Sequence, residues 1–150
     1  MKEFFKFDPL LNGSKGLVFI GDKILVYRRD TKPKMYPLYL DFPGGGKEEG
    51  ETPFDTFQRE VEEEFGLIIQ QSNIEYVRRY PSTIIEGEFF YFPVARLPKS
   101  LETLIVFGDE GLEYFLQTID DFLSAPDVWP GLQDRAKDYI KSLNSSKFVH

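Results

Sequence analysis

The sequence predicts an α+β domain in which a mixed β-sheet lies between layers of helices. Apolar runs of strand length come before and after one amphipathic helix in the middle of the chain, and a second helix is predicted near its end. The chain has 150 residues, enough for a substantial core, and no repeat, low-complexity segment or linker divides it. We therefore expect a single domain over residues 1–150.

The first part of the chain is predicted to supply strands and to lead into a glycine-rich loop. Gly21 and Asp22 separate two apolar runs by two residues, which is the spacing of a tight hairpin turn. Prolines and lysines mark the segment that follows as a loop. The predicted elements are an edge strand at residues 3–7, a loop at 8–15, strands at 16–20 and 23–28, a loop at 31–37 and a brief strand at 38–42.

The central helix has clear start and stop signals. Thr52 is a suitable N-cap, Pro53 suits the first helical position, and Gly66 provides a residue that can end the helix. Apolar side chains recur at spacings of three and four, and they predict one buried face formed by Phe54, Phe57, Val61 and Phe65.

One flank of this helix carries clustered carboxylates. At about 100° per residue, Glu60, Glu63 and Glu64 fall on one stripe beside the apolar face. Like charges at this spacing repel one another, so a positive partner is expected. Hard carboxylate oxygens suit Mg²⁺, with Mn²⁺ as an alternative. Seen alone, such a run is more often a solvated helix face.

The second half of the chain is predicted to complete the sheet and to cover it. Pro93 lies in a long aromatic run and is expected to place the end of that strand at an edge or a bulge. The predicted elements are strands at residues 74–80, 86–94 and 112–117, a weakly patterned connection at 97–111, a short helix at 119–123 and a terminal helix at 131–143.

Composition excludes several classes of function. The chain has no cysteine, which excludes disulfides, thiol nucleophiles and cysteine–zinc sites, and its only histidine is His150, which argues against a histidine-based triad. The net charge of −7 argues against binding to nucleic acids or to acidic membranes. The start of the chain is too charged for a signal peptide, and no apolar run could span a bilayer. We expect a cytoplasmic protein.

The segment from Gly45 to Leu67 resembles the signature of the Nudix hydrolase superfamily, to which MutT-like proteins belong. Its defined positions are filled here by Gly45, Glu51, Arg59, Glu60, Val61, Glu63, Glu64, Gly66 and Leu67. Residues 41–46 are similar to the family's usual lead-in. The resemblance is close over about a sixth of the chain and implies an α/β/α sandwich. It also implies that Glu51 and Arg59 orient the loop through an ion pair.

The function that this resemblance implies is hydrolysis of a phosphoanhydride bond in a nucleoside diphosphate linked to another group. Metal ions would neutralise the phosphates and activate water. Glu60 corresponds to the general base and also to a metal ligand. Glu63 and Glu64 correspond to metal ligands, and the carbonyl of Gly44 is a further candidate because glycine allows close approach of the backbone.

Site residues outside the signature are weaker candidates. Arg29, at the end of the second predicted hairpin strand, is placed like an arginine that contacts phosphate in relatives, and a plain surface arginine is the equal alternative. Many relatives carry a further glutamate on a late loop, where it binds metal or activates water. Glu110 fits that place best, followed by Glu113 and Glu88.

The substrate is left open among a nucleoside triphosphate, a nucleotide sugar and ADP-ribose. Pro81 stands where ADP-ribose pyrophosphatases carry a proline, but Thr83 and Ile84 replace the usual Pro-Gly of that subgroup, and a strand-ending proline is the alternative. A regulatory Nudix-fold domain that binds nucleotide without cutting it is the alternative from another class. The expected partner is a small-molecule nucleotide, and the resemblance leaves room for a homodimer.

Overall fold

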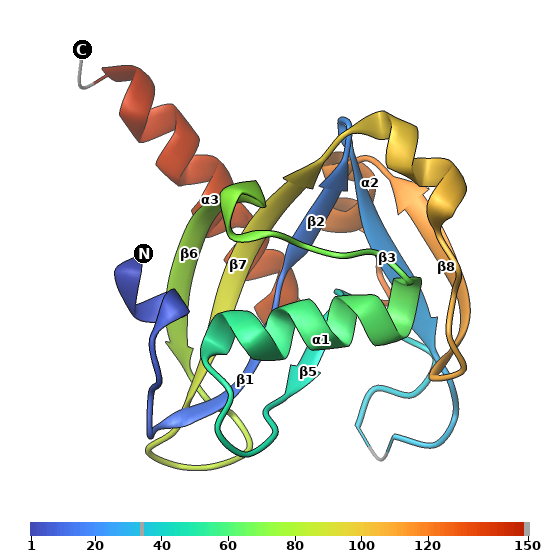
Figure 1. Cartoon of the computed structure of the whole chain (residues 1–150). Helices are drawn as coiled ribbons and strands as arrows, with labels where there is room; N and C mark the ends of the chain where they lie inside the picture. The colour runs from blue at the N-terminus through green and yellow to red at the C-terminus, as the bar shows by residue number, and fades with distance from the viewer. Residues whose placement is uncertain (34, 149–150) are drawn as a thin grey trace.

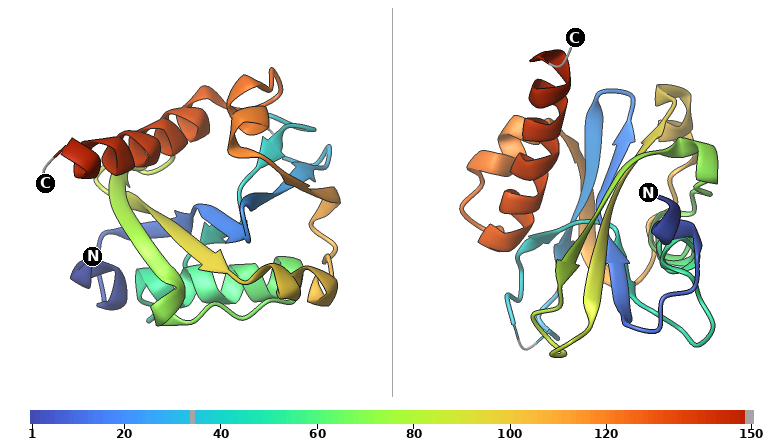
Figure 2. Two further views of the ribbon diagram at one scale, coloured as in Figure 1. Left: turned by 90° about the horizontal axis from the view of Figure 1, so that it is seen from above. Right: turned by 90° about the vertical axis from the view of Figure 1, so that its left-hand side faces the viewer.

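The molecule has three layers, with a mixed β-sheet between two layers of helices (Figure 1, Figure 2). The computed structural model describes residues 1–33 and 35–148. Helix α1, Pro53–Phe65, covers one face of the sheet, while helices α2, Ile119–Ser124, and α3, Pro130–Phe148, cover the other. The α/β/α sandwich predicted from the sequence is confirmed.

Within the described residues, eight strands form one sheet. They are β1 Leu11–Lys15, β2 Leu17–Ile20, β3 Lys23–Arg29, β4 Leu40–Asp41, β5 Gly44–Gly46, β6 Ile74–Pro81, β7 Phe89–Leu97 and β8 Gly111–Gln117. Short 3-10 helices lie at Lys2–Phe5, Gln71–Asn73 and Lys99–Leu104.

The sheet is mixed because β7 has neighbours in both directions. It runs parallel to β1 and β2 and antiparallel to β6. Strand β3 is antiparallel to β2, β4 and β8. The glycine strand β5 pairs antiparallel with β1 and sets Lys15 opposite Gly44. This pairing places the glycine-rich loop in the sheet directly under α1 (Figure 1).

Alternating strand residues build two separate cores. Val18 and Ile20 of β2 point to the α1 side, while Leu17 and Phe19 belong to the core on the α3 side. All four are at most 7% exposed. Because β2 is buried on both faces, its sequence is apolar throughout rather than alternating.

Helix α1 begins and ends where its sequence signals predict. The Thr52 side chain accepts a hydrogen bond from the Asp55 amide, and the Asp55 side chain accepts one from the Thr52 amide, which forms a capping box. Gly66 ends the helix with φ +67°, a left-handed conformation that favours glycine. The predicted apolar face is buried against the sheet, with Phe57 and Val61 fully buried.

Two predictions for the start of the chain are wrong. Residues 3–7 do not form an edge strand; Lys2–Phe5 is a 3-10 helix, and Phe4 packs edge-on against Phe54 of α1. Residues 8–15 are not all loop, because Leu11–Lys15 is strand β1. Its polar and glycine residues read as a turn, but later segments of the chain, β5 and β7, supply its partners.

The prediction for Pro93 is also wrong, since it lies inside β7 and not at an edge or bulge. On one side of β7, the neighbouring parallel strand changes at this point from β1 to β2, so the missing N–H costs no ladder bond there. Gly16 joins those two strands, and a Cβ on Gly16 would lie 2.0 Å from the Pro93 carbonyl oxygen. The proline is tolerated because the ladder is interrupted opposite it.

The other predicted strands and helices are confirmed, with shifted boundaries, while the predicted glycine-rich loop contains strand β5 and the connection at 97–111 contains the 3-10 helix Lys99–Leu104. The strand expected at 86–94 runs over Phe89–Leu97, and the terminal helix extends beyond 131–143 to Pro130–Phe148. Within the described residues, no helix combines the length and the apolar character that crossing a bilayer requires. His150 lies outside the described residues.

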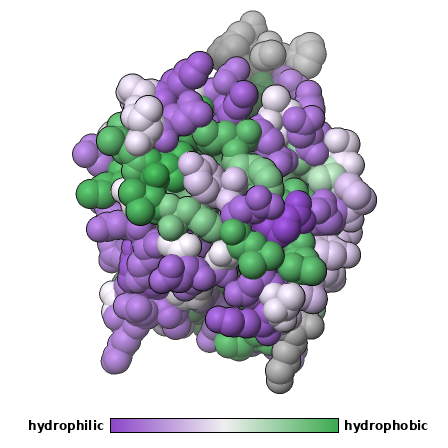
Figure 3. Space-filling model, turned by 90° about the vertical axis from the view of Figure 1, so that its right-hand side faces the viewer, coloured by the Kyte–Doolittle hydropathy of each residue, from purple (hydrophilic) through white to green (hydrophobic). Residues whose placement is uncertain are grey.

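Strand β8 lies at one side of the sheet, where it pairs with β3 alone among the described strands. Figure 3 shows this side of the molecule, on which apolar groups are divided by polar ones. Leu112 and Tyr114 of β8 are exposed, while Glu113 lies between them. A charged side chain on an edge strand discourages pairing with other chains.

Candidate active site

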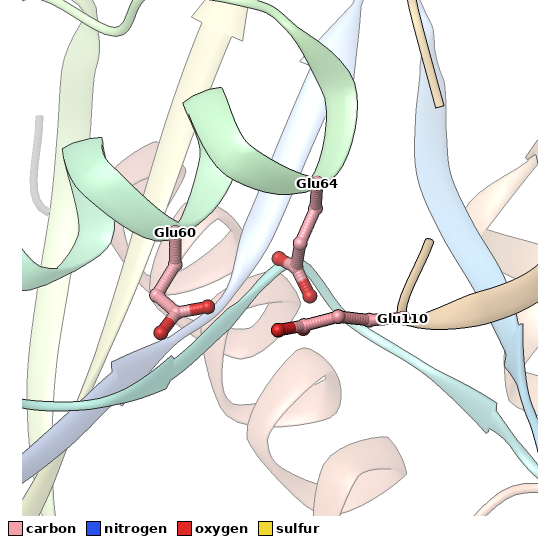
Figure 4. A group of neighbouring side chains, drawn as sticks. All are labelled: Glu60, Glu64 and Glu110. Carbon is pink, nitrogen blue, oxygen red and sulfur yellow. The ribbon is translucent and has the colours of Figure 1, made fainter. Parts of the chain in front are cut away.

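Three carboxylates from two distant segments meet at one end of α1. Glu60 and Glu64 lie one turn apart on α1, and Glu110 comes from the segment just before β8. Each offers one carboxylate oxygen, and these oxygens all lie within 4.8 Å of one another. Figure 4 shows the three side chains pointing toward a common space. A group of this kind can hold a hard divalent cation.

Glu64 is the most buried member of this cluster, at 3% exposure. The Gly44 amide donates a hydrogen bond of 2.9 Å to its Oε1 atom. Its other oxygen, Oε2, is buried and has no hydrogen-bond partner among the described residues. Burial raises the pKa of Glu64 to about 9. A buried carboxylate oxygen that lacks a donor fits a metal ligand, since a cation would satisfy it.

Glu60 is held between helix and loop. Its side chain is 12% exposed, and Arg59 Nη1 donates a 2.9 Å hydrogen bond to Oε1. Burial raises the pKa of Glu60, and the Arg59 guanidinium opposes this rise. A Cβ at Gly45 would lie 2.7 Å from the Glu60 carboxyl carbon. Gly45 therefore leaves the space that Glu60 occupies.

Glu110 is brought to α1 by the segment that precedes it. The Gly108 amide donates to the Glu64 carbonyl at 2.8 Å, and the Val106 amide donates to the Phe65 carbonyl at 3.0 Å. A Cβ at Gly108 would lie 2.6 Å from the Glu63 carbonyl oxygen, so only glycine allows this approach. The segment thereby satisfies free carbonyls at the end of α1 and places Glu110 beside the other two carboxylates.

The two other late candidates lie elsewhere. Glu113 is on β8, where its Oε1 lies 3.9 Å from Nε of Arg28, and Glu88 lies in the segment before β7. Neither belongs to the three-carboxylate group. The structure therefore brings Glu110, the first of the three sequence candidates, to the acids of α1.

Glu63 points differently from its two neighbours. Its side chain is 51% exposed and its Oε2 atom lies 3.4 Å from Nη1 of Arg59. The structure does not place Glu63 in the group formed by Glu60, Glu64 and Glu110. Its role as a metal ligand stays a prediction, and so does that of the Gly44 carbonyl.

Arg59 ties the glycine loop to α1, as the sequence predicts. Its Nε and Nη2 atoms donate to the two carboxylate oxygens of Glu51 at 2.8 Å and 3.0 Å. Nη2 also donates to the Gly46 carbonyl at 2.9 Å. A bidentate pair of this kind fixes direction as well as distance, so the predicted orienting ion pair is confirmed.

A second charged group lies on the sheet beside the carboxylates, and sequence reasoning missed two of its members, Lys15 and Asp41. Lys15 Nζ lies 2.6 Å from Oδ2 of Asp41, a residue that is 3% exposed. The same oxygen lies 3.8 Å from Nε of Arg29 and accepts a 3.3 Å hydrogen bond from the Tyr27 hydroxyl. Burial and the Asp41 charge raise the pKa of Tyr27. Asp41 thus holds two cations near Glu64.

The signals for this group in the sequence were weak. Asp41 opens the lead-in to the signature, but nothing local marks it as buried. Lys15 lies in a polar segment that reads as loop, and its position becomes visible only when β1 pairs with β5. Arg29, which the sequence suggested as a phosphate contact, is found at the end of β3 facing Asp41.

A cavity of about 340 Å³ opens next to this charged group. Its wall is formed at one end by Lys15, Arg29 and Asp41. The remainder of the lining is largely aromatic and aliphatic and includes Tyr36, Tyr39, Leu40, Phe90, Trp129 and Leu132, with Arg135 among them. A cavity of this size and lining is suited to a small planar ligand.

Comparison with known proteins identifies the family. Residues 13–135 match the NUDIX domain. Among curated proteins, the chain is 28% identical over 134 residues to Nudix hydrolase 3 of Caenorhabditis elegans, an alignment that covers 86% of this chain and 55% of the relative. It is 39% identical over 57 residues to an 8-oxo-dGTP diphosphatase of Haemophilus influenzae, covering 37% of this chain and 40% of the relative. The chain thus spans about half the length of these curated relatives.

Solved structures show the same fold at low sequence identity. A MutT protein from Methanosarcina mazei Go1 superposes with a TM-score of 0.70 at 17% identity, covering 91% of this chain and 98% of the other. A Caenorhabditis elegans Ap4A hydrolase gives a TM-score of 0.68 at 12% identity, covering 89% and 98%. With the family match extending over most of its length, the chain belongs to the NUDIX domain family.

Proposed function

We propose that this protein is a metal-dependent pyrophosphohydrolase that cleaves a phosphoanhydride bond of a nucleoside diphosphate linked to another group. The observation that carries the proposal is the meeting of Glu60, Glu64 and Glu110 around a common space. The curated relatives support it, since one is named a diphosphatase and the other a hydrolase. Every acidic position of the signature is filled by a glutamate in this chain.

The metal that these ligands suit is Mg²⁺, with Mn²⁺ as the alternative. All three side chains offer hard oxygen atoms, and the free Oε2 atom of Glu64 lacks any donor among the described residues. When bound, the metal neutralises phosphate charge and acidifies a water molecule. Glu60, Glu64 and Glu110 are the residues assigned to hold it, and Glu63 is retained as a fourth candidate.

The three carboxylates lie in different surroundings, and these surroundings suit them to different roles. Glu64 is fixed by the Gly44 amide and cannot reorient without breaking that bond, which suits a rigid ligand. Glu60 and Glu110 are assigned to accept the proton of the attacking water. Glu60 is half of a hydrogen-bonded pair with Arg59, which stabilises its charged form and keeps it a competent acceptor. Glu110 is exposed and can approach a bound substrate.

The cations beside Asp41 are assigned to the phosphates. The side chains of Arg29 and Lys15 are 27% and 22% exposed, and both line the cavity, so each has surface that a ligand can reach. Their charge offsets that of a polyphosphate entering a site rich in carboxylates. Asp41 positions both cations, so it acts through them and needs no contact with the substrate.

The test is a substrate panel with Mg²⁺ that contains nucleoside triphosphates, deoxynucleoside triphosphates, nucleotide sugars, ADP-ribose and dinucleoside polyphosphates. Products are identified by mass, and the reaction in H₂¹⁸O shows which phosphorus is attacked. We expect cleavage of at least one compound, lost on chelation of the metal. Glu62→Gln is the matched control for Glu64→Gln, since Glu62 is an exposed acid on the same helix that does not belong to the cluster.

Turnover of no compound on the panel, with nucleotide binding retained, would favour the regulatory domain that binds without cutting. Cleavage that persists in the presence of chelator would contradict the metal assignment. The proposal also keeps the cytoplasm as the expected compartment. A homodimer stays a separate prediction, which light scattering of the purified protein tests directly.

A further inference from the structure

The aromatic cavity contains a buried cation that has no direct ion-pair partner among the described residues, although the charge of Asp41 acts on it at longer range. Arg135 of α3 lines the cavity and is 8% exposed. Its guanidinium lies 4.8 Å from the centre of the Tyr80 ring and 5.6 Å from that of Trp129. Within residues 1–33 and 35–148, no carboxylate forms an ion pair with it and no atom accepts a hydrogen bond from it.

Such an arrangement is unusual for arginine. Other arginines of the sheet and of α1 are paired, for example Arg59 with Glu51 and Arg96 with Glu75. Leaving a guanidinium buried without acceptors costs free energy, and burial accordingly lowers the pKa of Arg135. The two aromatic rings hold the group by cation–π contact but leave its N–H donors unused. These donors are available to a ligand in the cavity.

The walls around Arg135 are suited to a planar ring. Tyr36 lies with its ring centre 5.2 Å from that of Tyr39 and 6.3 Å from that of Trp129. Tyr36 adopts a positive φ angle of 52°, a conformation that is strained for residues other than glycine. Aromatic walls favour a heterocycle over a phosphate, because a phosphate would lose its hydration here.

The charged end of the cavity lies close to the proposed catalytic group, because the charges of Lys15 and Asp41 act on Glu64. Lys15 and Asp41 line its charged end, and Lys15 lies opposite Gly44, whose amide binds Glu64. A nucleotide with its phosphates at the carboxylates can therefore place its base among the aromatic side chains. The inference that follows rests on the proposed function, since it assigns the base-binding end of the same site.

We propose that Arg135 recognises the base of the substrate and selects 6-oxopurines, such as guanine and hypoxanthine, over adenine. O6 and N7 of a 6-oxopurine are neighbouring acceptors that match the two-pronged donor geometry of a guanidinium. Adenine carries an amino group at C6, which is a donor. It would face the N–H donors of the arginine and could not form a hydrogen bond with them. A bidentate pair of this kind discriminates between bases by about 5- to 150-fold.

The experiment measures nucleotide binding without metal, and so without catalysis. Trp129 is the only tryptophan of the chain and lines the cavity, so its fluorescence reports occupancy. GMP, IMP, AMP and CMP are titrated in the presence of EDTA, with calorimetry as a second readout. We expect GMP and IMP to bind about 5- to 150-fold more tightly than AMP and CMP.

Arg135→Lys removes the fork but keeps the charge, so the preference should disappear while the fold is retained. Arg78→Lys is the matched control. Arg78 lies 5.2 Å over the same Tyr80 ring, but it does not line the cavity. The control should keep the preference of the natural protein.

Equal or tighter binding of AMP or CMP, absence of GMP binding, or a preference that survives in Arg135→Lys would overturn the inference. These results are independent of hydrolysis. Base selection without turnover of any substrate would leave the Arg135 assignment standing and remove the proposed function. Turnover without base selection would support the proposed function and remove the Arg135 assignment.

Discussion

Lys15 and Asp41 form a 2.6 Å ion pair between the three-glutamate cluster and the aromatic cavity. The two residues come from strands that are not neighbours in sequence, and Asp41 is almost completely buried. The pair joins the parts of the site that we assign to the phosphates and to the base. Variants of this pair should therefore change both the stability of the fold and the binding of substrate, and the two effects can be measured separately.

Lys15→Met should lower the free energy of unfolding by about 1–3 kcal/mol, because it leaves the buried Asp41 carboxylate with a weaker set of partners. Adding Asp41→Asn should recover part of that loss, while KM stays raised in both variants because the phosphate contact is gone. Denaturant melts and steady-state kinetics measure the two effects. Lys23→Met is the control, since Lys23 is exposed and outside the cavity. A double variant with normal KM would remove Lys15 from the phosphate site.

Glu110→Gln should reduce kcat by about 10²- to 10⁴-fold, because it removes a proton acceptor or metal ligand from the cluster. Glu113→Gln should change kcat little, since Glu113 lies against Arg28 on β8. Both side chains are exposed, so neither variant should lose much stability. Kinetics with saturating Mg²⁺ make the comparison. An equal loss in both variants would contradict the assignment of the late acid to Glu110.

Gly45→Ala should reduce activity by about 10²-fold with little change in melting temperature. The new Cβ would lie 2.7 Å from the Glu60 carboxyl carbon, so the flexible end of that side chain has to move while the backbone need not. Gly46→Ala is matched to it, because its nearest neighbour would be the Asn12 carbonyl oxygen at 3.9 Å. Similar activity in the two variants would show that activity does not depend on the exact position of the Glu60 carboxylate.

The stability of the metal-free protein should fall as the pH rises. Glu64 has a pKa of about 9 in the folded protein against an ordinary value of 4.5. Between these values the unfolded chain releases the proton and the folded protein keeps it, so unfolding becomes easier with increasing pH. Glu64→Gln should remove this dependence, and it should also lower activity at least about 100-fold if Glu64 holds the metal.

Mg²⁺ should oppose this loss of stability, and more strongly at pH 8 than at pH 6, because binding requires the ionised carboxylate. Chemical denaturation with and without Mg²⁺ across this range measures both effects. Identical pH profiles for the natural protein and Glu64→Gln would show that another group controls the stability.

Local chemistry made the centre of the chain predictable. The signals for α1 lie within about fifteen residues of sequence: the N-cap at Thr52, the apolar stripe and the left-handed Gly66. The helix and its buried face could therefore be predicted from local sequence. The Glu51–Arg59 pair was implied by the signature on the same ground. Glu110 was predicted as the late-loop glutamate only from the resemblance, with Glu113 and Glu88 as alternatives.

What could not be predicted depends on pairing between distant segments. Strand β1 has no strand-like composition, and it forms because β5 and β7 offer backbone partners on both sides. Lys15 belongs to that strand, so its place in the site was hidden with it. Glu63 was grouped with Glu60 and Glu64 by helical spacing and by the resemblance to the signature, whereas in the folded molecule its exposed carboxylate lies 3.4 Å from Arg59 and outside the three-glutamate group. Arg135 lies in a helix whose apolar periodicity is weak. Only the folded molecule shows that its guanidinium contacts aromatic rings and forms no ion pair among the described residues.

Glu64 fastens two segments at once, since its side chain accepts the Gly44 amide and its carbonyl accepts the Gly108 amide. The segments before α1 and before β8 therefore share one anchor, and thermal opening of either should loosen the other. In amide hydrogen exchange, the protons of Gly44 and Gly108 should slow together when the cluster is loaded with cation. A replacement of the Glu64 side chain acts directly on the attachment to Gly44 alone, because the bond to Gly108 uses the backbone carbonyl that every residue carries.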